Sequence, residues 1–195
     1  MVASAQPLPD RYQAKYIPDR LLSLALGVKI TETITGQPPF SELGATLALA
    51  ELYQAAGRLE EAIGLLQQVH ETTAEPLVRL SLCDLLFADH DYEAVVETAS
   101  AVTNDSDVSV ETLHLRGAAV IALGHGAGAI DAFRDALSHT SGRDPGLLKV
   151  VRYDRALAYE GLGQVARAKA DLERIHAVDP GFEDAKARLE GQIGD

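Results

Sequence analysis

One residue pattern occurs four times along this chain. Its copies occupy residues 50–57, 82–89, 117–124 and 156–163, and each is followed five residues later by an alanine. These alanines are 32, 35 and 39 residues apart: Ala62, Ala94, Ala129 and Ala168. A repeat of this length is typical of solenoids, in which stacked helical units bury each other's apolar faces. The pattern therefore predicts an all-α fold.

Helix boundaries follow from capping residues, prolines and glycines. Asp144-Pro145 and Asp179-Pro180 each supply an N-cap followed by a proline at the first helical position, 35 residues apart. Gly57 ends the first helix of the first pair. The predicted helices cover residues 41–56, 59–70, 76–88, 91–102, 109–123, 126–139, 145–161, 164–177 and 180–190.

The repeats resemble tetratricopeptide repeats (TPRs). The fourth copy matches best, with Ala156, Tyr159, Gly163, Ala168, Leu172 and Pro180 at the family's small, aromatic, glycine, alanine, bulky and proline positions. The second copy is the most divergent, with Leu82 at the small position, Asp89 at the glycine position and only Ala94 kept. The resemblance implies a right-handed α-solenoid of antiparallel helix pairs.

The same features suggest a division of the chain. Residues 1–15 are expected to be a flexible tail, and residues 16–40 an N-terminal segment outside the repeats, with a short helix and an extended stretch. The stretch Val28–Thr35 is predicted to be extended or a single strand. Since a lone strand needs a partner, it should lie against the array, pair with another chain or be helical instead. The TPR-like array is expected over 41–191, in pairs at 41–73, 75–107, 109–143 and 145–178, with a capping helix at 180–190.

Charge and cysteine content limit the partners. The net charge of −12 disfavours nucleic acid and an anionic membrane surface, which need a basic protein face. Cys83 is the single cysteine, and the N-terminus lacks a basic stretch followed by an apolar one. We therefore expect a cytoplasmic protein that binds neither nucleic acid nor membrane.

No residue set in the sequence predicts an enzyme, a metal site or a cofactor. Residues 161–166 match the dinucleotide fingerprint Gly-x-Gly-x-x-Ala, but they follow a helical segment where that motif needs a strand. Cys83 has no histidine at a spacing that would activate it. His114 is the histidine to which we assign a ligand-contacting role, because it should face the inner side of the third repeat.

TPR arrays line a concave groove with the first helix of each pair, and the resemblance implies such a groove here. Arg116 and Arg155 are instead predicted to form structural links across repeats with Asp131, Asp135 or Glu173. The predicted groove residues are Leu47, Glu51, Gln54, Arg79, Cys83, Leu86, His114, Ala118, Ile121, Tyr153, Leu157 and Glu160.

The expected function is therefore that of a non-enzymatic scaffold which holds a peptide or protein segment in this groove. The segment would carry leucine-like anchors and some basic residues, since the groove is partly apolar and mildly acidic. The alternative is a homodimer or other self-associating protein, joined through the N-terminal segment or the last helix, with the groove filled by the chain itself.

Overall fold

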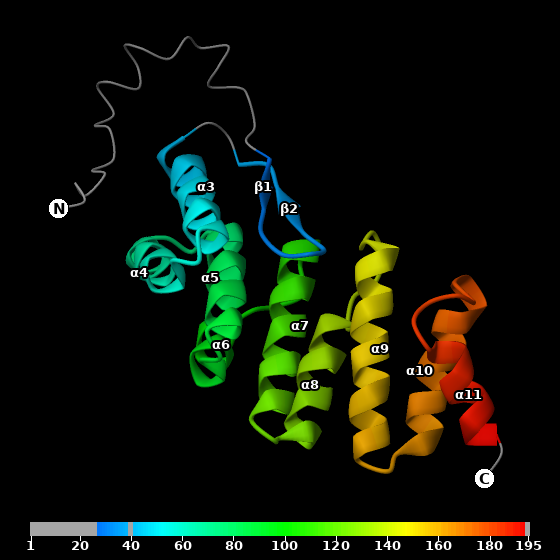
Figure 1. Ribbon diagram of the computed structural model, residues 1–195. Coiled ribbons are helices and arrows are strands. Elements are labelled where there is room, and N and C mark those ends of the chain that lie inside the picture. The colour runs from blue at the N-terminus through cyan, green and yellow to red at the C-terminus, as the bar shows by residue number, and fades with distance from the viewer. Residues whose placement is uncertain (1–26, 39–40, 194–195) are drawn as a thin grey trace. The chain divides into compact units, whose positions relative to one another are not determined.

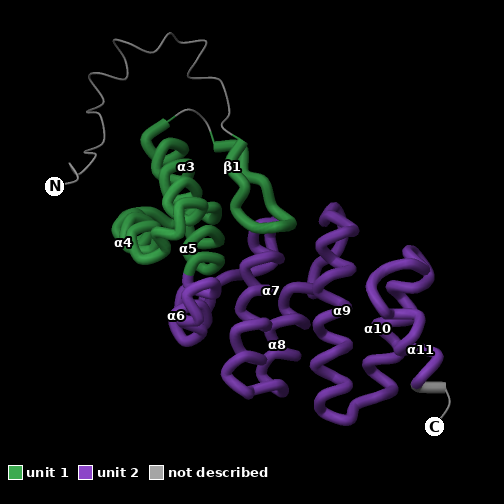
Figure 2. Tube along the Cα trace, in the orientation of Figure 1, with its two compact units in different colours: residues 1–85 green, residues 86–195 purple. Residues whose placement is uncertain are grey.

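The computed structural model describes residues 27–38 and 41–193, and it divides the chain into two compact units, residues 1–85 and 86–195 (Figure 2). The tail expected at 1–15 and the short helix expected before Gly27 lie outside the described residues. The described residues of each unit are mostly helical, and none of their helices is both long and apolar enough to cross a bilayer.

The first unit contains a short hairpin and the first helices of the array. Strands β1 (Val28–Lys29) and β2 (Thr35–Gly36) precede helices α3 (Glu42–Ala55) and α4 (Leu59–His70), as Figure 1 shows. Helix α5 (Pro76–Ala88) begins in this unit and ends in the second. Ser41 caps α3, its side chain accepting a hydrogen bond from the Gly44 amide.

The stretch Val28–Thr35 is extended as predicted, but it holds two short strands and not one. The stretch folds back on itself, and β1 pairs with β2 in antiparallel register, Val28 opposite Gly36. The Thr31 hydroxyl closes the turn by accepting hydrogen bonds from the amides of Thr33 and Ile34, at 3.2 and 3.1 Å. A strand alone has no partner for its backbone groups, and this turn provides one within the same segment.

The second unit holds α6 (Tyr92–Thr98), then two helix pairs and a closing helix. The first pair is α7 (Asp107–Ala122) with α8 (Gly126–Ala136), the second is α9 (Pro145–Gly161) with α10 (Val165–Val178), and α11 (Ala185–Ile193) follows. Helix α11 starts five residues after the predicted Pro180, because the intervening backbone turns at Glu183, whose φ is 45°. The expected pairing of Pro145 with the N-cap Asp144 is confirmed, and the cap accepts a bond from the Leu147 amide at 2.8 Å.

The four corners between paired helices share one backbone pattern. The corner N–H binds the carbonyl three residues back, the next N–H binds five residues back, and the corner φ is positive: Gly57, His90, Gly124 and Gly163. The second corner is thus His90, and the prediction of Asp89 is one residue off. Counted from His90, the helix-contact positions are Cys83 and Val95. Both are fully buried, so they replace the Leu82 and Ala94 assigned from sequence.

Small residues bring paired helices close together. Ala62, Ala129 and Ala168 are fully buried at the same position of their repeats. At Gly117 an added Cβ would overlap the Phe133 ring of α8. The aromatic ring therefore fills the space that a side chain at this glycine would need, as predicted from the small-residue pattern.

The two arginines that precede the small positions link helices of the same pair. Arg116 on α7 bonds Asp135 on α8 at 2.8 Å, and Arg155 on α9 forms two 2.8 Å bonds to the buried Asp171 on α10. Asp135 was among the predicted partners, whereas Asp171 takes the place of the predicted Glu173. The prediction that these links cross repeats is wrong, because each arginine bonds an acid on the second helix of its own pair.

Candidate functional site

A cleft of about 520 Å³ opens in the second unit between α7 and α9. Its walls are mainly aliphatic, and two of them, Ile121 and Leu162, are each 41% exposed. Phe133 of α8 forms the fully buried floor. The lining residues are Ala118, Ile121, Gly124, Gly126, Phe133, Asp154, Leu157, Ala158, Gly161 and Leu162.

Helical spacing explains why these residues converge. Ala118 and Ile121 lie three apart on α7, and Asp154, Leu157, Ala158 and Gly161 follow the 3, 4 and 7 spacing of one face of α9. Glycines at the corner add backbone without side chains, which keeps the cleft open. Large aliphatic groups left this exposed beside a concave surface are typical of contact sites for another molecule.

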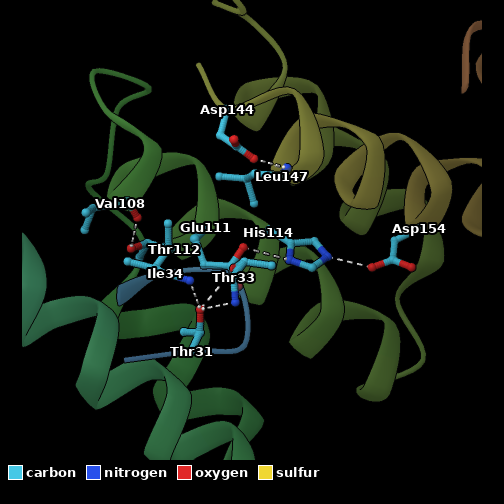
Figure 3. Close-up of polar contacts among 10 residues, drawn as sticks. All are labelled: Thr31, Thr33, Ile34, Val108, Glu111, Thr112, His114, Asp144, Leu147 and Asp154. Carbon is cyan, nitrogen blue, oxygen red and sulfur yellow. Dashed lines mark hydrogen bonds and ion pairs between the residues drawn. The ribbon is translucent and has the colours of Figure 1, made fainter. Parts of the chain in front are cut away.

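One end of the cleft carries a charged cluster formed by Glu111 and His114 of α7 and Asp154 of α9 (Figure 3). His114 Nε2 lies 2.6 Å from Asp154 Oδ2, and His114 Nδ1 lies 3.4 Å from Glu111 Oε2. The side chains of Glu111 and His114 are 6% and 12% exposed, while that of Asp154 is 32% exposed. Asp154 is therefore the member of the cluster that faces the cleft.

The cluster determines the charge of His114. Burial by itself lowers the pKa of this imidazole, but hydrogen bonds and charges from Asp154 and Glu111 outweigh burial and raise the pKa to about 9. His114 is thus protonated at neutral pH, donates a hydrogen bond to Asp154 and forms an ion pair with Glu111. Two acids surround this one cation, and Asp154 is the acid that reaches the cleft.

Three of the predicted groove residues meet in this cleft: Ala118, Ile121 and Leu157. His114 does not line the cleft itself. It bonds Asp154, which does, so the ligand-contacting role predicted for His114 would act through Asp154. These positions come from the first helices of the third and fourth pairs, as the TPR resemblance implied.

Two other predicted groove residues of α9 contact the end of the chain. Glu160 forms an ion pair with Arg188 of α11 at 2.5 Å, and the Tyr153 hydroxyl donates to Asp184 at 2.5 Å. The Tyr153 ring also packs edge-on against Phe182. Both side chains therefore help to dock the C-terminal helix.

The remaining predicted groove residues are Leu47, Glu51, Gln54, Arg79 and Cys83 in the first unit and Leu86 in the second. Leu47, Cys83 and Leu86 are buried, so they belong to the core rather than to a surface. Gln54 donates to Asp84 at 3.3 Å, and Glu51 and Arg79 are partly buried.

Seven lining residues of the cleft were missed in the sequence analysis, among them Phe133, Asp154 and Leu162. Asp154 stands three residues before the predicted Leu157, on the same face of its helix, so the helical spacing contained the signal for it. Phe133 and Leu162 reach the cleft from a second helix and a corner, and single-helix spacing carries no signal for either.

Comparisons with known proteins place these features in context. A family model described as T7SS, ESX-1 secretion system protein EccA1, N-terminal domain, matches residues 20–192. Two crystal structures of MamA share 17% sequence identity with the chain, with TM-scores of 0.64 and 0.65. They cover 75% and 77% of this chain, which in turn covers 83% and 80% of theirs.

A third structure is that of TTC0263, a thermophilic TPR protein in Thermus thermophilus, with 15% identity. It covers 76% of this chain and is itself covered over 97%, but its TM-score of 0.36 is too low to support an argument. The search of curated proteins returned no match. The TPR resemblance and the all-α solenoid predicted from the repeats are both confirmed.

Proposed function

Because the chain belongs to the family of the EccA1 N-terminal domain, a component of the ESX-1 secretion system, we propose that it is a protein-binding module of such a system. The cleft between α7 and α9 would hold a segment of the partner. The observation that carries the proposal is a concave, mainly aliphatic surface on the side of a TPR-type array where the first helices of successive pairs meet.

The cleft volume suits a short piece of a partner rather than a whole helix. A cleft of about 520 Å³ can take a large apolar side chain together with its neighbouring residues. Ile121 and Leu162 are exposed in the free protein, and their burial would be the main gain on binding. We propose an extended or helical partner segment with one large apolar anchor.

Charge suggests what accompanies this anchor. Asp154 is the acidic residue of the cleft, and the chain carries a net charge of −12. A lysine or arginine one helical turn from the anchor would meet the Asp154 carboxylate, and the overall charge would speed the encounter at low salt. The proposed partner segment is therefore apolar and basic.

We further propose that the module acts by binding and not by catalysis. The Cys83 thiol is fully buried, and burial raises its pKa to about 12, which keeps it neutral at physiological pH. Protonated His114 is engaged by two carboxylates, so it has no lone pair to act as a base.

A capture experiment tests the cleft. The full chain, an Ile121→Glu variant and a Leu52→Glu variant would be used to capture partners from the native cell, and each candidate would be re-measured with purified components by calorimetry. Leu52 is 65% exposed on α3 and lies outside the cleft. Leu52→Glu is therefore the control, because it introduces the same charge in place of an aliphatic side chain of similar size. We expect Ile121→Glu to weaken binding at least tenfold, about 1.4 kcal/mol or more.

Equal loss of binding in the two variants, or no loss in either, would contradict the proposal. Circular dichroism of both variants should match the wild type, since each altered side chain lies at the surface. Binding should also weaken with added salt, because part of the attraction comes from Asp154.

Self-association through the last helix is less well supported than binding of a different protein. Ala185 and Leu189 of α11 are buried against Leu172 and Ile175 of α10, so the apolar side of α11 is already used within the unit. We therefore propose a partner other than a second copy of the chain. Light scattering over a wide concentration range should give one constant mass, and a mass that rises with concentration would favour the alternative.

A further inference from the structure

A second cleft, of about 370 Å³, lies near the opposite end of α9. It opens between the first turns of α9 and the last turns of α10, whose chain directions are opposed. Its residues on α9 follow the 3, 4 and 7 spacing of one helix face. The lining residues are Pro145, Leu148, Lys149, Arg152, Arg174 and Val178.

This cleft is basic in an acidic protein. Lys149, Arg152 and Arg174 line it, whereas the whole chain carries a net charge of −12. Two acids balance part of the charge. Asp179 accepts a bond from Lys149 at 2.5 Å, and Asp171 lies 3.4 Å from Arg174. The Asp144 side chain at the start of α9 accepts the hydrogen bond of the Leu147 amide and so serves as a helix cap.

Arg152 is the cation without a counter-ion in contact. In the part of the chain that the structure describes, its guanidinium has no hydrogen bond or ion pair, although it is partly buried. Both oxygens of Asp171 are taken by Arg155, at 2.8 Å each, so Asp171 acts on Arg152 only as a nearby charge. Burial lowers the pKa of Arg152, and the charges of Arg155 and Arg174 lower it further, against the opposite effect of Asp171.

A partly desolvated guanidinium without a partner is a favourable site for a carboxylate, which can accept two parallel hydrogen bonds from it. The cleft also has apolar walls. Val178 is 73% exposed and Pro145 is also exposed, whereas Leu148 of the same lining is already buried. A free anion would gain nothing from these walls, whereas a peptide that carries an apolar side chain next to an acid would bury them.

We propose that this basic cleft binds an acidic peptide segment, with a carboxylate on Arg152 and an adjacent apolar side chain on Pro145 and Val178. The site is separate from the cleft between α7 and α9, which is acidic and lined by different residues. The module would thus have two docking sites of opposite charge on the two ends of α9, and it could hold a basic and an acidic segment together.

A titration of the full chain tests the proposal. The probe is the synthetic peptide acetyl-Leu-Glu-Leu-Asp-amide, with acetyl-Leu-Gln-Leu-Asn-amide as its uncharged match, added up to millimolar concentration. The observable is the NMR signal of the Arg152 Nε–H group, assigned by its absence in Arg152→Gln. We expect the acidic peptide to shift this signal in a saturable way, and the uncharged peptide to bind at least about tenfold more weakly.

Matched variants identify the site. Arg152→Gln should weaken the acidic peptide about tenfold, while Arg134→Gln should leave its affinity unchanged, because Arg134 lies on α8 and is paired with Asp131 at 2.6 Å. Val178→Ser should weaken binding in the same direction as Arg152→Gln. Ile121→Glu should not affect it, which separates this result from the test of the first cleft.

Three outcomes would overturn the proposal. They are no shift of the Arg152 signal at millimolar acidic peptide, equal effects of Arg152→Gln and Arg134→Gln, and a shift by inorganic phosphate as strong as that by the peptide. The last would show a simple anion site with no role for the apolar walls.

Discussion

His90 holds at one corner the backbone conformation that glycine holds at the other three. Its φ is +62°, against +71°, +82° and +69° at Gly57, Gly124 and Gly163. A residue with a Cβ in this region is strained by roughly 1 kcal/mol. Partial compensation comes from a 2.8 Å hydrogen bond between His90 Nδ1 and the Tyr92 hydroxyl, which is exposed. The corner is therefore a place where a single substitution can relieve strain.

His90→Gly should raise the free energy of unfolding by about 0.5 kcal/mol, since relief of the left-handed strain outweighs the loss of one exposed hydrogen bond. Denaturant unfolding measures the change. Asp89→Gly is the matched control, because Asp89 is not a positive-φ residue and a glycine there only adds chain entropy, so it should lower stability. Stabilisation by Asp89→Gly in place of His90→Gly would contradict the assigned corner.

Helices α7 and α9 are joined by a buried charge as well as by apolar packing. His114 of α7 bonds Asp154 of α9 at 2.6 Å, and Glu111 holds the other ring nitrogen from its own helix. The positive charge of the His114 imidazolium offsets the repulsion between the two carboxylates and so lets them lie close together. Its protonation therefore links the distance between these first helices to pH.

The stability of the second unit should fall as pH rises from 6.5 through 9. The folded pKa of His114 is raised to about 9 from 6.5, so its contribution is complete below pH 6.5 and is lost as the pH passes 9. The loss should be on the order of 3 kcal/mol. Unfolding at a series of pH values measures it, compared with His114→Gln, which should flatten this part of the profile.

The exposed His139 provides the control. His139→Gln should leave the pH profile as it is in the wild type. A wild-type profile that is flat or rises over this pH range would contradict the assigned charge of His114.

At the scale of the whole chain, the array is closed at its C-terminal end by α11. Leu189 and Ala185 cover Leu172 and Ile175 of α10, which are fully buried, and Phe182 packs against the same cluster. In a solenoid each unit is stabilised by its neighbour, so the last pair needs a closing element. Helix α11 plays this part, with polar links from Arg188 to Glu160 and Asp184.

Deletion of residues 183–195 should lower the free energy of unfolding by about 3–5 kcal/mol, because the covering of the α10 core is removed. It should also increase dye binding to exposed apolar surface. Arg188→Ala, which keeps the helix and removes its partly exposed ion pairs, should cost less than about 1 kcal/mol. An unchanged unfolding curve after the deletion would mean that α11 does not close the array.

Much of the fold was predictable because repetition multiplies a weak local signal. Three of the four corners, the buried alanines and the proline-started α9 were all read correctly from spacing. The second corner was missed because Cys83 and Val95 fill sites that glycine or alanine fill in other repeats, so matching residue types put the register one position early. The backbone hydrogen bonds and the positive φ of His90 revealed the shift.

The candidate site was predictable only along single helices. Ala118 and Ile121 on α7 and Leu157 on α9 follow from helical periodicity, which places each on the cleft-lining face of its own helix. Tyr153 and Glu160 share that periodicity, but they bond Asp184 and Arg188 at the C-terminal end of the chain. Arg155 bonds Asp171 on the facing helix α10. Which residues of a helix face remain accessible to a partner depends on the other segments that pack against that face. These segments are distant in the sequence, so the outcome cannot be read from one helix.

The amino-acid sequence alone determined the helix pairs and their order, since periodic apolar residues, caps and breakers act within a few residues of one another. The tertiary structure alone decided that Asp154 faces an open cleft while His114 is buried behind it, and that Arg152 is left without a counter-ion. Charges and cavities arise where helices far apart in sequence meet, and their energies depend on distance and burial, which no local pattern encodes.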